Sequence, residues 1–214
     1  MIVKTTEEIE NLRKSGKILA DALRLTAAMV KPGVTTAELD LAAEKYIRDQ
    51  GGEPAFLNYS QDGSAYPFPA ALCVSINDEV VHGIPSELRT VAEGDLVMLD
   101  LGVSYNGYFS DAAITVFAGT ADEAGQKLAD ATKEALKAAI KIIKPGVRVG
   151  DIGAAIAAVA KKYNFAVVED LGGHSLGLVP HEPPYIGNVG VAGKGEVLPQ
   201  GLVIAVEPIF TEGK

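Results

Sequence analysis

The chain has 214 residues and a formal net charge of −9, from 28 Asp and Glu against 19 Lys and Arg. This charge argues against a nucleic-acid-binding surface or an anionic membrane as its partner. Hydrophobic residues make up 48%, enough for a sizeable core, and the lone Cys73 excludes an internal disulfide and fits a reducing cytosol. The opening MIVKTTEEIE lacks the apolar region of a signal peptide. We therefore expect a cytoplasmic protein.

Two helices are predicted at the start of the chain. The first opens with a capping box at residues 5–8 and ends at Lys31-Pro32-Gly33, and the second opens with a capping box at residues 35–38 and ends at Gly51-Gly52. The stripe of the first helix that should face the core consists of Ile9, Leu12, Gly16, Leu19, Leu23, Ala27 and Val30. A strand is expected over residues 71–76.

A hairpin is predicted over residues 94–117, GDLVMLDLGVSYNGYFSDAAITVF. The Asn106-Gly107 pair between two apolar runs favours a two-residue type I′ turn, which places Asp100 opposite Ala113. Asp111 then shares a face with Asp100 as its diagonal neighbour. Two such carboxylates in an apolar sheet repel each other unless a proton or a cation lies between them, which indicates a divalent metal. An alternative is that Asp111 ends a strand near solvent while Asp100 accepts backbone hydrogen bonds.

The second half of the chain repeats the first. Helices are expected from a cap at residues 120–123 and over residues 151–163, and strands over residues 166–169 and 202–209. The Lys-Pro-Gly turns at Lys31 and Lys144 align at an offset of 113 residues, and Asp100 aligns with Glu207 at an offset of 107. We therefore predict a single α+β domain over residues 1–214, made of two pseudo-twofold halves, about 6–117 and 120–210. The alternative is that Lys-Pro-Gly is a common helix stop and that the match is chance.

Three histidines lie in Gly- and Pro-rich contexts, His82 in VVHGIP, His174 in LGGHSLG and His181 in VPHEPP. A lone histidine is more often structural, but three in such loops beside acidic strands favour a site. Glu207 is a charge inside the apolar run VIAVEPIF and needs a partner. Mostly carboxylate ligands with one imidazole suit hard or borderline divalent ions such as Mn, Fe, Co or Zn, and they do not indicate a thiolate zinc site.

These motifs together resemble the methionine aminopeptidases, specifically type I. The resemblance rests on SINDEVVHGIP, LDLG…GYFSDAA, GGHSLG…HEPP and GLVIAVEP, and it covers the whole chain. It implies the pita-bread (creatinase/aminopeptidase-like) fold, an antiparallel sheet covered by helices, and two divalent metal ions, with Co, Mn, Fe or Zn as candidates. The implied metal ligands are Asp100, Asp111, His174 and Glu207.

The resemblance also implies roles around the metals. His82 and His181 match residues that contact substrate and stabilise the intermediate, and Glu207 matches a proton shuttle. Phe68 and Cys73 lie where the family lines its methionine pocket. The implied reaction is removal of the N-terminal methionine from nascent polypeptides with a small second residue, a step in protein maturation. We expect a monomer without membrane or direct nucleic-acid contacts and with the ribosome as a candidate partner.

Two features depart from the family pattern. GHSLG replaces the usual GHGLG or GHGIG, and the chain stops at TEGK, before the strand that in the family carries a further bridging glutamate. We expect a C-terminally truncated chain that is itself poorly active. The alternative function is a metal-free pita-bread protein that binds peptides or partners without peptidase activity.

Overall fold

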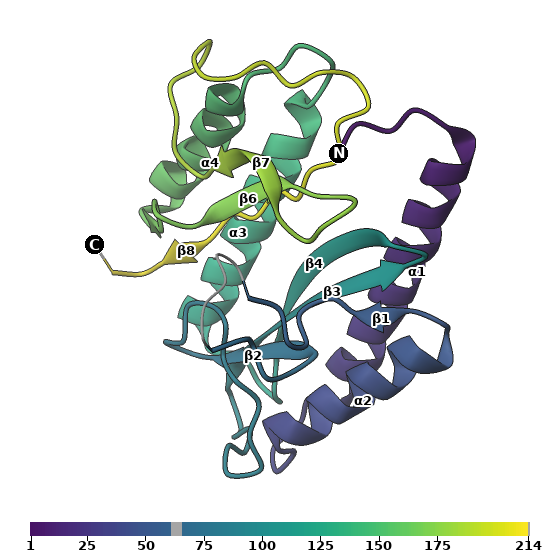
Figure 1. Cartoon of the computed structure of the whole chain (residues 1–214). Helices are drawn as coiled ribbons and strands as arrows, with labels where there is room; N and C mark the ends of the chain where they lie inside the picture. Colours follow the sequence, from purple (N-terminus) through teal and green to yellow (C-terminus); the bar gives the residue numbers. More distant parts are fainter. Residues whose placement is uncertain (61–65, 214) are drawn as a thin grey trace. The chain divides into compact units, whose positions relative to one another are not determined.

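The structure is a computed structural model that describes residues 1–60 and 66–213 (Figure 1). The chain forms two compact units, each with its own core. We call residues 5–122 with 177–180 the N-terminal unit, and residues 1–4, 123–176 and 181–214 the C-terminal unit. No helix in the described residues is both long and apolar enough to cross a membrane.

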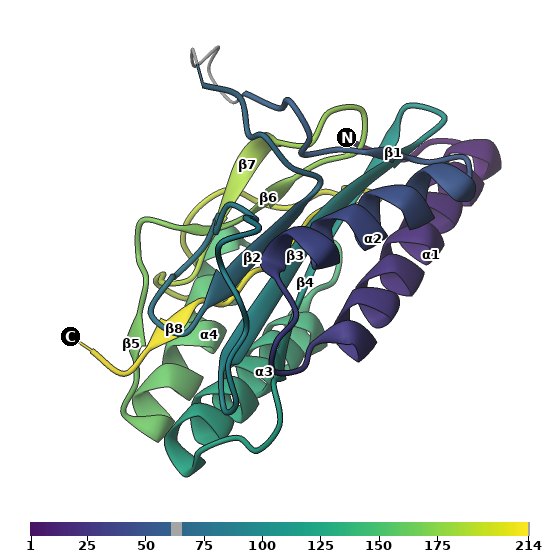
Figure 2. The ribbon, with the colours of Figure 1, turned by 90° about the horizontal axis from the view of Figure 1, so that it is seen from below.

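The N-terminal unit is an antiparallel sheet with two helices on one face (Figures 1 and 2). The central strand β3 pairs with β4 along one edge and with β1 and β2 along the other. The helices are α1 (Thr6–Met29) and α2 (Thr36–Asp49), and the strands are β1 (Glu53–Pro54), β2 (Leu72–Ile76), β3 (Leu96–Tyr105) and β4 (Tyr108–Phe117). The strand predicted over residues 71–76 is confirmed as β2, which starts one residue later than expected.

Both predicted capping boxes are confirmed. Thr5 Oγ1 accepts a hydrogen bond from Glu8 N at 3.2 Å, and the Glu8 carboxylate accepts one from Thr5 N at 3.0 Å. Thr35 and Glu38 make the same reciprocal pair, with distances of 3.2 and 2.7 Å. Each box satisfies backbone N–H groups that a helix start would otherwise leave without an acceptor, so the sequence sets where both helices begin.

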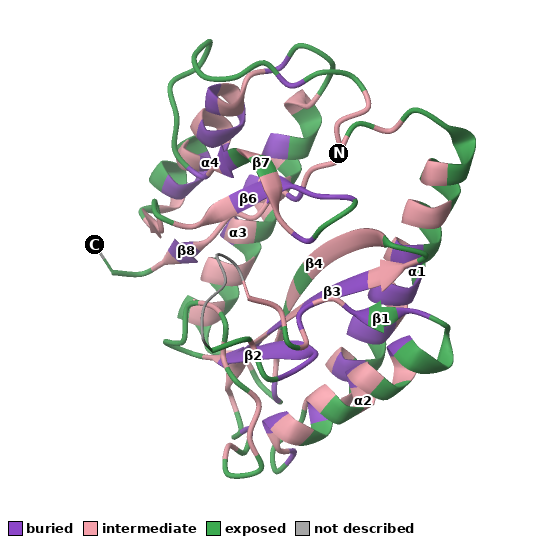
Figure 3. Ribbon diagram, in the orientation of Figure 1, coloured by how far each residue is buried: buried purple, intermediate pink, exposed green. Residues whose placement is uncertain are grey.

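The predicted core stripe of α1 is partly wrong. Leu19 and Leu23 are buried as expected, but Ile9 is 40% exposed. Fully buried Ser15 lies on the inward face instead, where its hydroxyl donates to Val103 O at 2.8 Å. Hydrophobicity alone misses such positions, because a hydroxyl that finds a carbonyl acceptor can be buried at little cost. Figure 3 shows the buried face of α1 lying against the sheet.

The hairpin is confirmed in turn and register. Asn106 and Gly107 both have positive φ, 51° and 78°, as a type I′ turn requires. Tyr105 lies opposite Tyr108, and Asp100 lies opposite Ala113.

The C-terminal unit consists of a helix pair and two small antiparallel sheets. Its elements are α3 (Glu123–Ile142), α4 (Val149–Tyr163), β5 (Ala166–Val167), β6 (Gly172–Ser175), β7 (Glu182–Gly187) and β8 (Phe210–Thr211). Strand β5 pairs with β8, and β6 pairs with β7. The buried face of α3 is built from three alanines, Ala131, Ala135 and Ala139, which let α4 approach closely.

The predicted strand over residues 202–209 is wrong, since this segment forms isolated bridges and a strand begins only at Phe210. Val203 N donates to Met1 O at 3.0 Å, whereas Ala205 N donates to His174 O at 2.8 Å. The segment divides its backbone hydrogen bonds between two partners, so no continuous ladder forms with either. Strand β6, which the sequence did not predict, supplies one of these partners.

The two Lys-Pro-Gly turns are held in the same way. Gly33 and Gly146 have φ values of 92° and 88°, in the region that favours glycine. Gly33 N donates to Val91 O at 2.9 Å, and Gly146 N donates to Leu198 O at 3.0 Å. The donors are offset by 113 residues and the acceptors by 107, the offsets of the predicted repeat.

Candidate metal centre

The two aspartates of the N-terminal unit share one face of the hairpin. Asp100 on β3 lies opposite Ala113, and Asp111 on β4 lies opposite Gly102, which makes the two carboxylates diagonal neighbours. Leu99 and Leu101 point into the core beneath the helices, so Asp100 projects from the other face and is half-buried. The apolar run around Asp100 therefore reflects the covered face of the strand rather than a buried environment for the carboxylate.

Cys73 lies beside this pair on β2. It is 3% exposed and is the register partner of Asp100. Burial raises the pKa of the Cys73 thiol, and the negative charges of Asp100 and Asp111 raise it further. The thiol therefore stays protonated at neutral pH, so Cys73 can line this face as a small apolar group.

Asp40 on α2 fixes the start of β2, and sequence reasoning missed it. Its carboxylate accepts hydrogen bonds from Ala71 N and Leu72 N, both at 2.9 Å. Burial nevertheless raises the pKa of Asp40, and the charge of Glu44 also raises it, against the lowering effect of the two hydrogen bonds. The sequence feature that could have indicated this role is an acidic residue next to Leu39, a buried position on the inner side of the helix.

His82 and Phe68 lie on separate loops of the N-terminal unit. His82 is exposed, between β2 and β3, and its φ of 57° is unusual for a residue other than glycine. Phe68 is half-buried and held by its backbone, which donates to Tyr59 O at 2.9 Å and accepts from Asn58 N at 2.8 Å.

In the C-terminal unit, His174 on β6 faces Glu207. His174 Nε2 lies 3.1 Å from Glu207 Oε1, and His174 Nδ1 lies 2.9 Å from Ser175 O. Because a carbonyl can only accept, Nδ1 carries the proton of a neutral ring, and the lone pair of Nε2 then points at the carboxylate. Glu207 Oε1 is buried and has no hydrogen bond within the described residues. Two facing lone pairs need a proton or a cation between them.

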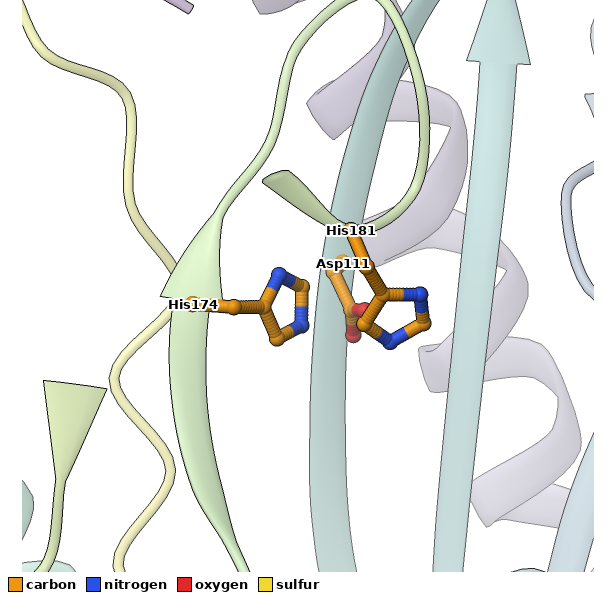
Figure 4. Close-up of side chains that lie close together, drawn as sticks. All are labelled: Asp111, His174 and His181. Carbon is orange, nitrogen blue, oxygen red and sulfur yellow. The ribbon is translucent and has the colours of Figure 1, made fainter. Parts of the chain in front are cut away.

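His181 joins this pair, just before β7. Its ring centroid lies 4.2 Å from that of His174, with 45° between the planes. Figure 4 shows the two imidazoles, one from β6 and one from the turn that leads into β7. The C-terminal unit thus brings together three of the predicted site residues, His174, His181 and Glu207.

The amino group of Met1 holds together the two segments that carry these histidines. The ammonium donates to Ser175 Oγ at 2.9 Å and to Leu176 O at 3.1 Å, and it forms an ion pair with Glu182. Ser175 follows His174, and Glu182 follows His181. Sequence reasoning missed this arrangement, and the one signal for it was an acidic residue directly after His181.

The side-chain atoms of His174 and Glu207 that face each other fit a divalent metal ion as ligands. Carboxylate oxygen and imidazole nitrogen suit hard or borderline ions. Two such ligands bound at about 2.0–2.2 Å lie roughly 3 Å apart when the angle at the metal is near 90–110°. The 3.1 Å separation of His174 Nε2 and Glu207 Oε1 matches that geometry.

Comparisons with known proteins agree with the motifs. The model of metallopeptidase family M24 matches residues 10–214. A methionine aminopeptidase of Aquifex aeolicus is 46% identical over 208 residues, which cover 96% of this chain and 81% of the relative. A methionine aminopeptidase structure from Thermotoga maritima superposes with a TM-score of 0.94 at 40% identity, over 100% of this chain and 84% of that one.

More distant similarity extends to proline-directed enzymes. A prolidase structure from Pyrococcus furiosus superposes with a TM-score of 0.79 at 27% identity, and the match covers 97% of this chain but 57% of the prolidase. The pita-bread fold is therefore shared, while identity and coverage are higher for the methionine enzymes. The chain belongs to the methionine aminopeptidases of metallopeptidase family M24.

Proposed function

We propose that this chain removes the N-terminal methionine from polypeptides whose second residue is small, with two divalent ions of Co, Mn, Fe or Zn. Family membership supports the reaction. The observation that carries the metal dependence is the pair of facing acceptors, His174 Nε2 and Glu207 Oε1, 3.1 Å apart. A cation between them converts a repulsive contact into two ligand bonds.

We assign the ligands to two half-sets. Asp100 and Asp111 form one on the β3–β4 hairpin, and His174 and Glu207 form the other on β6 and the 202–209 segment. When bound, the ions would act as Lewis acids that activate a water and polarise the scissile carbonyl. The hydrogen bond from His174 Nδ1 to Ser175 O would hold Nε2 as the ligand atom.

The remaining site residues act on the substrate in this proposal. His82 and His181 donate hydrogen bonds to the substrate carbonyl as negative charge develops on its oxygen. The Glu207 carboxylate carries a proton to the leaving amine. Phe68 and Cys73 line the pocket for the methionine side chain, and the protonated, buried thiol of Cys73 suits that apolar role.

The alternative, a metal-free binding protein of the same fold, is less well supported. Without a metal, a neutral His174 ring with its proton on Nδ1 would leave the buried Glu207 Oε1 without a hydrogen bond within the described residues, at a cost of about 1–3 kcal/mol. Only a second proton on the ring would remove this cost. We further propose a cytoplasmic monomer that meets its substrates as they leave the ribosome.

Peptide hydrolysis tests the proposal. Protein from the complete reading frame should cleave Met-Ala-Ser, should be much slower on Met-Ile-Ser, and should leave the dipeptide Met-Pro intact. Chelation should abolish cleavage, and added Co²⁺ or Mn²⁺ should restore it. Cleavage that survives full chelation would contradict the metal dependence, and hydrolysis of Met-Pro in preference to Met-Ala-Ser would contradict the substrate class.

A further inference from the structure

Arg89 holds the loop that carries His82, although it lies seven residues away. The loop joins β2 to β3 and contains NDEVVHGIPSELR. Because the φ of His82 is 57°, its backbone is in the left-handed region, which a loop must stabilise by contacts elsewhere. Two sets of contacts hold the backbone of this loop next to His82.

The first contact is between Gly83 and β2. Val74 N donates to Gly83 O at 2.9 Å, and Gly83 N donates to Ser75 Oγ at 3.0 Å. The approach is so close that a Cβ on Gly83 would lie 2.1 Å from Val74 O. The residue after His82 is therefore fixed directly against the strand.

The second contact is the Arg89 guanidinium, which gathers both sides of the loop. It donates to Ile84 O at 2.8 Å and to Val74 O at 3.3 and 3.4 Å, and it forms an ion pair with Glu79. Glu79 also accepts from Ile76 N at 2.8 Å. One planar group thus joins β2, the segment before His82 and the segment after it, a task suited to the fixed fork of arginine donors.

The backbone of Arg89 is itself anchored. Arg89 O accepts from Thr36 N at 2.9 Å, at the start of α2, and neighbouring Thr90 forms a bridge with Thr35. The guanidinium therefore projects from a fixed point, and its side chain is 27% exposed. Displacement of this group would release Ile84 and Glu79 together.

From these contacts we infer that Arg89 is a positioning residue, which acts on the reaction through His82. The inference rests on the proposed function, in which His82 donates a hydrogen bond to the substrate. Loss of the guanidinium lets the loop move, so His82 is misplaced while its chemistry is unchanged. A misplaced group costs roughly 10- to 100-fold in rate.

A double-mutant cycle on Met-Ala-Ser tests this inference in protein from the complete reading frame. R89A should lower kcat by roughly 10- to 100-fold, with KM changed by less than about twofold. R89K should recover part of kcat, because an ammonium can reach one of the acceptors but cannot bridge all of them. Exposed Arg13 on α1 gives the control R13A, expected at wild-type kcat.

The decisive variant is R89A/H82A. It should be no slower than H82A alone, because Arg89 has no effect once its target is gone. A further loss in the double mutant equal to that of R89A alone would overturn the role of Arg89 and leave that of His82 intact. Wild-type kcat in H82A would overturn the proposed role of His82 and the inference with it. Thermal unfolding of R89K and R13A checks that any R89K deficit occurs in folded protein.

Discussion

The two units use the same turn between their helices but present their site residues differently. Gly33 and Gly146 are held by equivalent hydrogen bonds. The N-terminal unit then places its carboxylates on two regular ten-residue strands. The C-terminal unit places His174 beside a register shift in β6 and Glu207 on a segment without a continuous strand. The same kind of turn is thus compatible with regular strands in one unit and with irregular backbone around the proposed site residues of the other.

The largest expected effect is loss of activity when one proposed ligand is removed from either half-set. D111N in the N-terminal unit and H174A in the C-terminal unit should both reduce cleavage of Met-Ala-Ser to background, because each removes a proposed metal ligand. Exposed Glu10 and Glu196 offer the charge-neutralising controls E10Q and E196Q, expected to be fully active. If one half-set proved dispensable, the two units would not contribute equally.

A smaller effect is expected for His82, which we place outside the ligand set. H82A should lower turnover by roughly 10²–10³, the size of a lost oxyanion donor, while metal content stays near that of the wild type. Steady-state kinetics and metal analysis of one preparation measure both. Loss of metal in H82A would instead make His82 a ligand.

The two turns should respond equally to substitution. Gly33 and Gly146 have positive φ, and a Cβ on either would meet open space, so the cost comes from the backbone alone. G33A and G146A should each lower the free energy of unfolding by about 1–2 kcal/mol. Urea unfolding would measure this. A difference above about 1 kcal/mol between them would show that the turns are not equivalent.

The smallest expected effect concerns protein stability and the different ways in which α2 and α4 begin. In place of the Thr35–Glu38 box, the first turn of α4 carries Asp151, whose carboxylate accepts hydrogen bonds from Arg148 N at 2.9 Å and from Gly193 N at 2.6 Å. The bond from Gly193, followed by that from Arg148, lowers the pKa of Asp151. Because the folded pKa lies below the unfolded one, the resulting stability is present above about pH 4 and is lost as pH falls through the folded pKa.

D151N should therefore unfold at a lower temperature than the wild type at pH 7, with the difference shrinking toward pH 2–3. Thermal unfolding across this range gives the comparison. E196Q, which alters an exposed carboxylate, should keep the wild-type pH profile. A D151N deficit that is constant with pH would mean that the charge of Asp151 is not what stabilises this helix start.

Local sequence rules predicted the regular part of the fold. The Asn106-Gly107 turn fixes the hairpin register, and with it the shared face of Asp100 and Asp111, because turn type and pleat leave one arrangement. The capping boxes set the helix starts for a similar reason. All of these interactions act between residues close in the chain.

The irregular part depends on distant partners and could not be predicted. Residues 202–209 show the apolar pattern of a strand, yet their backbone hydrogen bonds are divided between Met1 and β6. Strands β6 and β7 contain Gly172, Gly173, Pro183 and Pro184, which hide their alternation. The motifs predict His174 and Glu207 as site residues, but their 3.1 Å contact depends on this long-range pairing.

Metal stoichiometry tests the central proposal most directly, that residues of both half-sets are metal ligands. Native mass spectrometry with Mn²⁺ or Co²⁺ titration should give two ions per chain for the wild type made from the complete reading frame. D111N and H174A should each lose at least one ion, and E10Q and E196Q should keep both. Two ions retained with wild-type affinity in D111N or in H174A, or none bound by the wild type, would contradict the account.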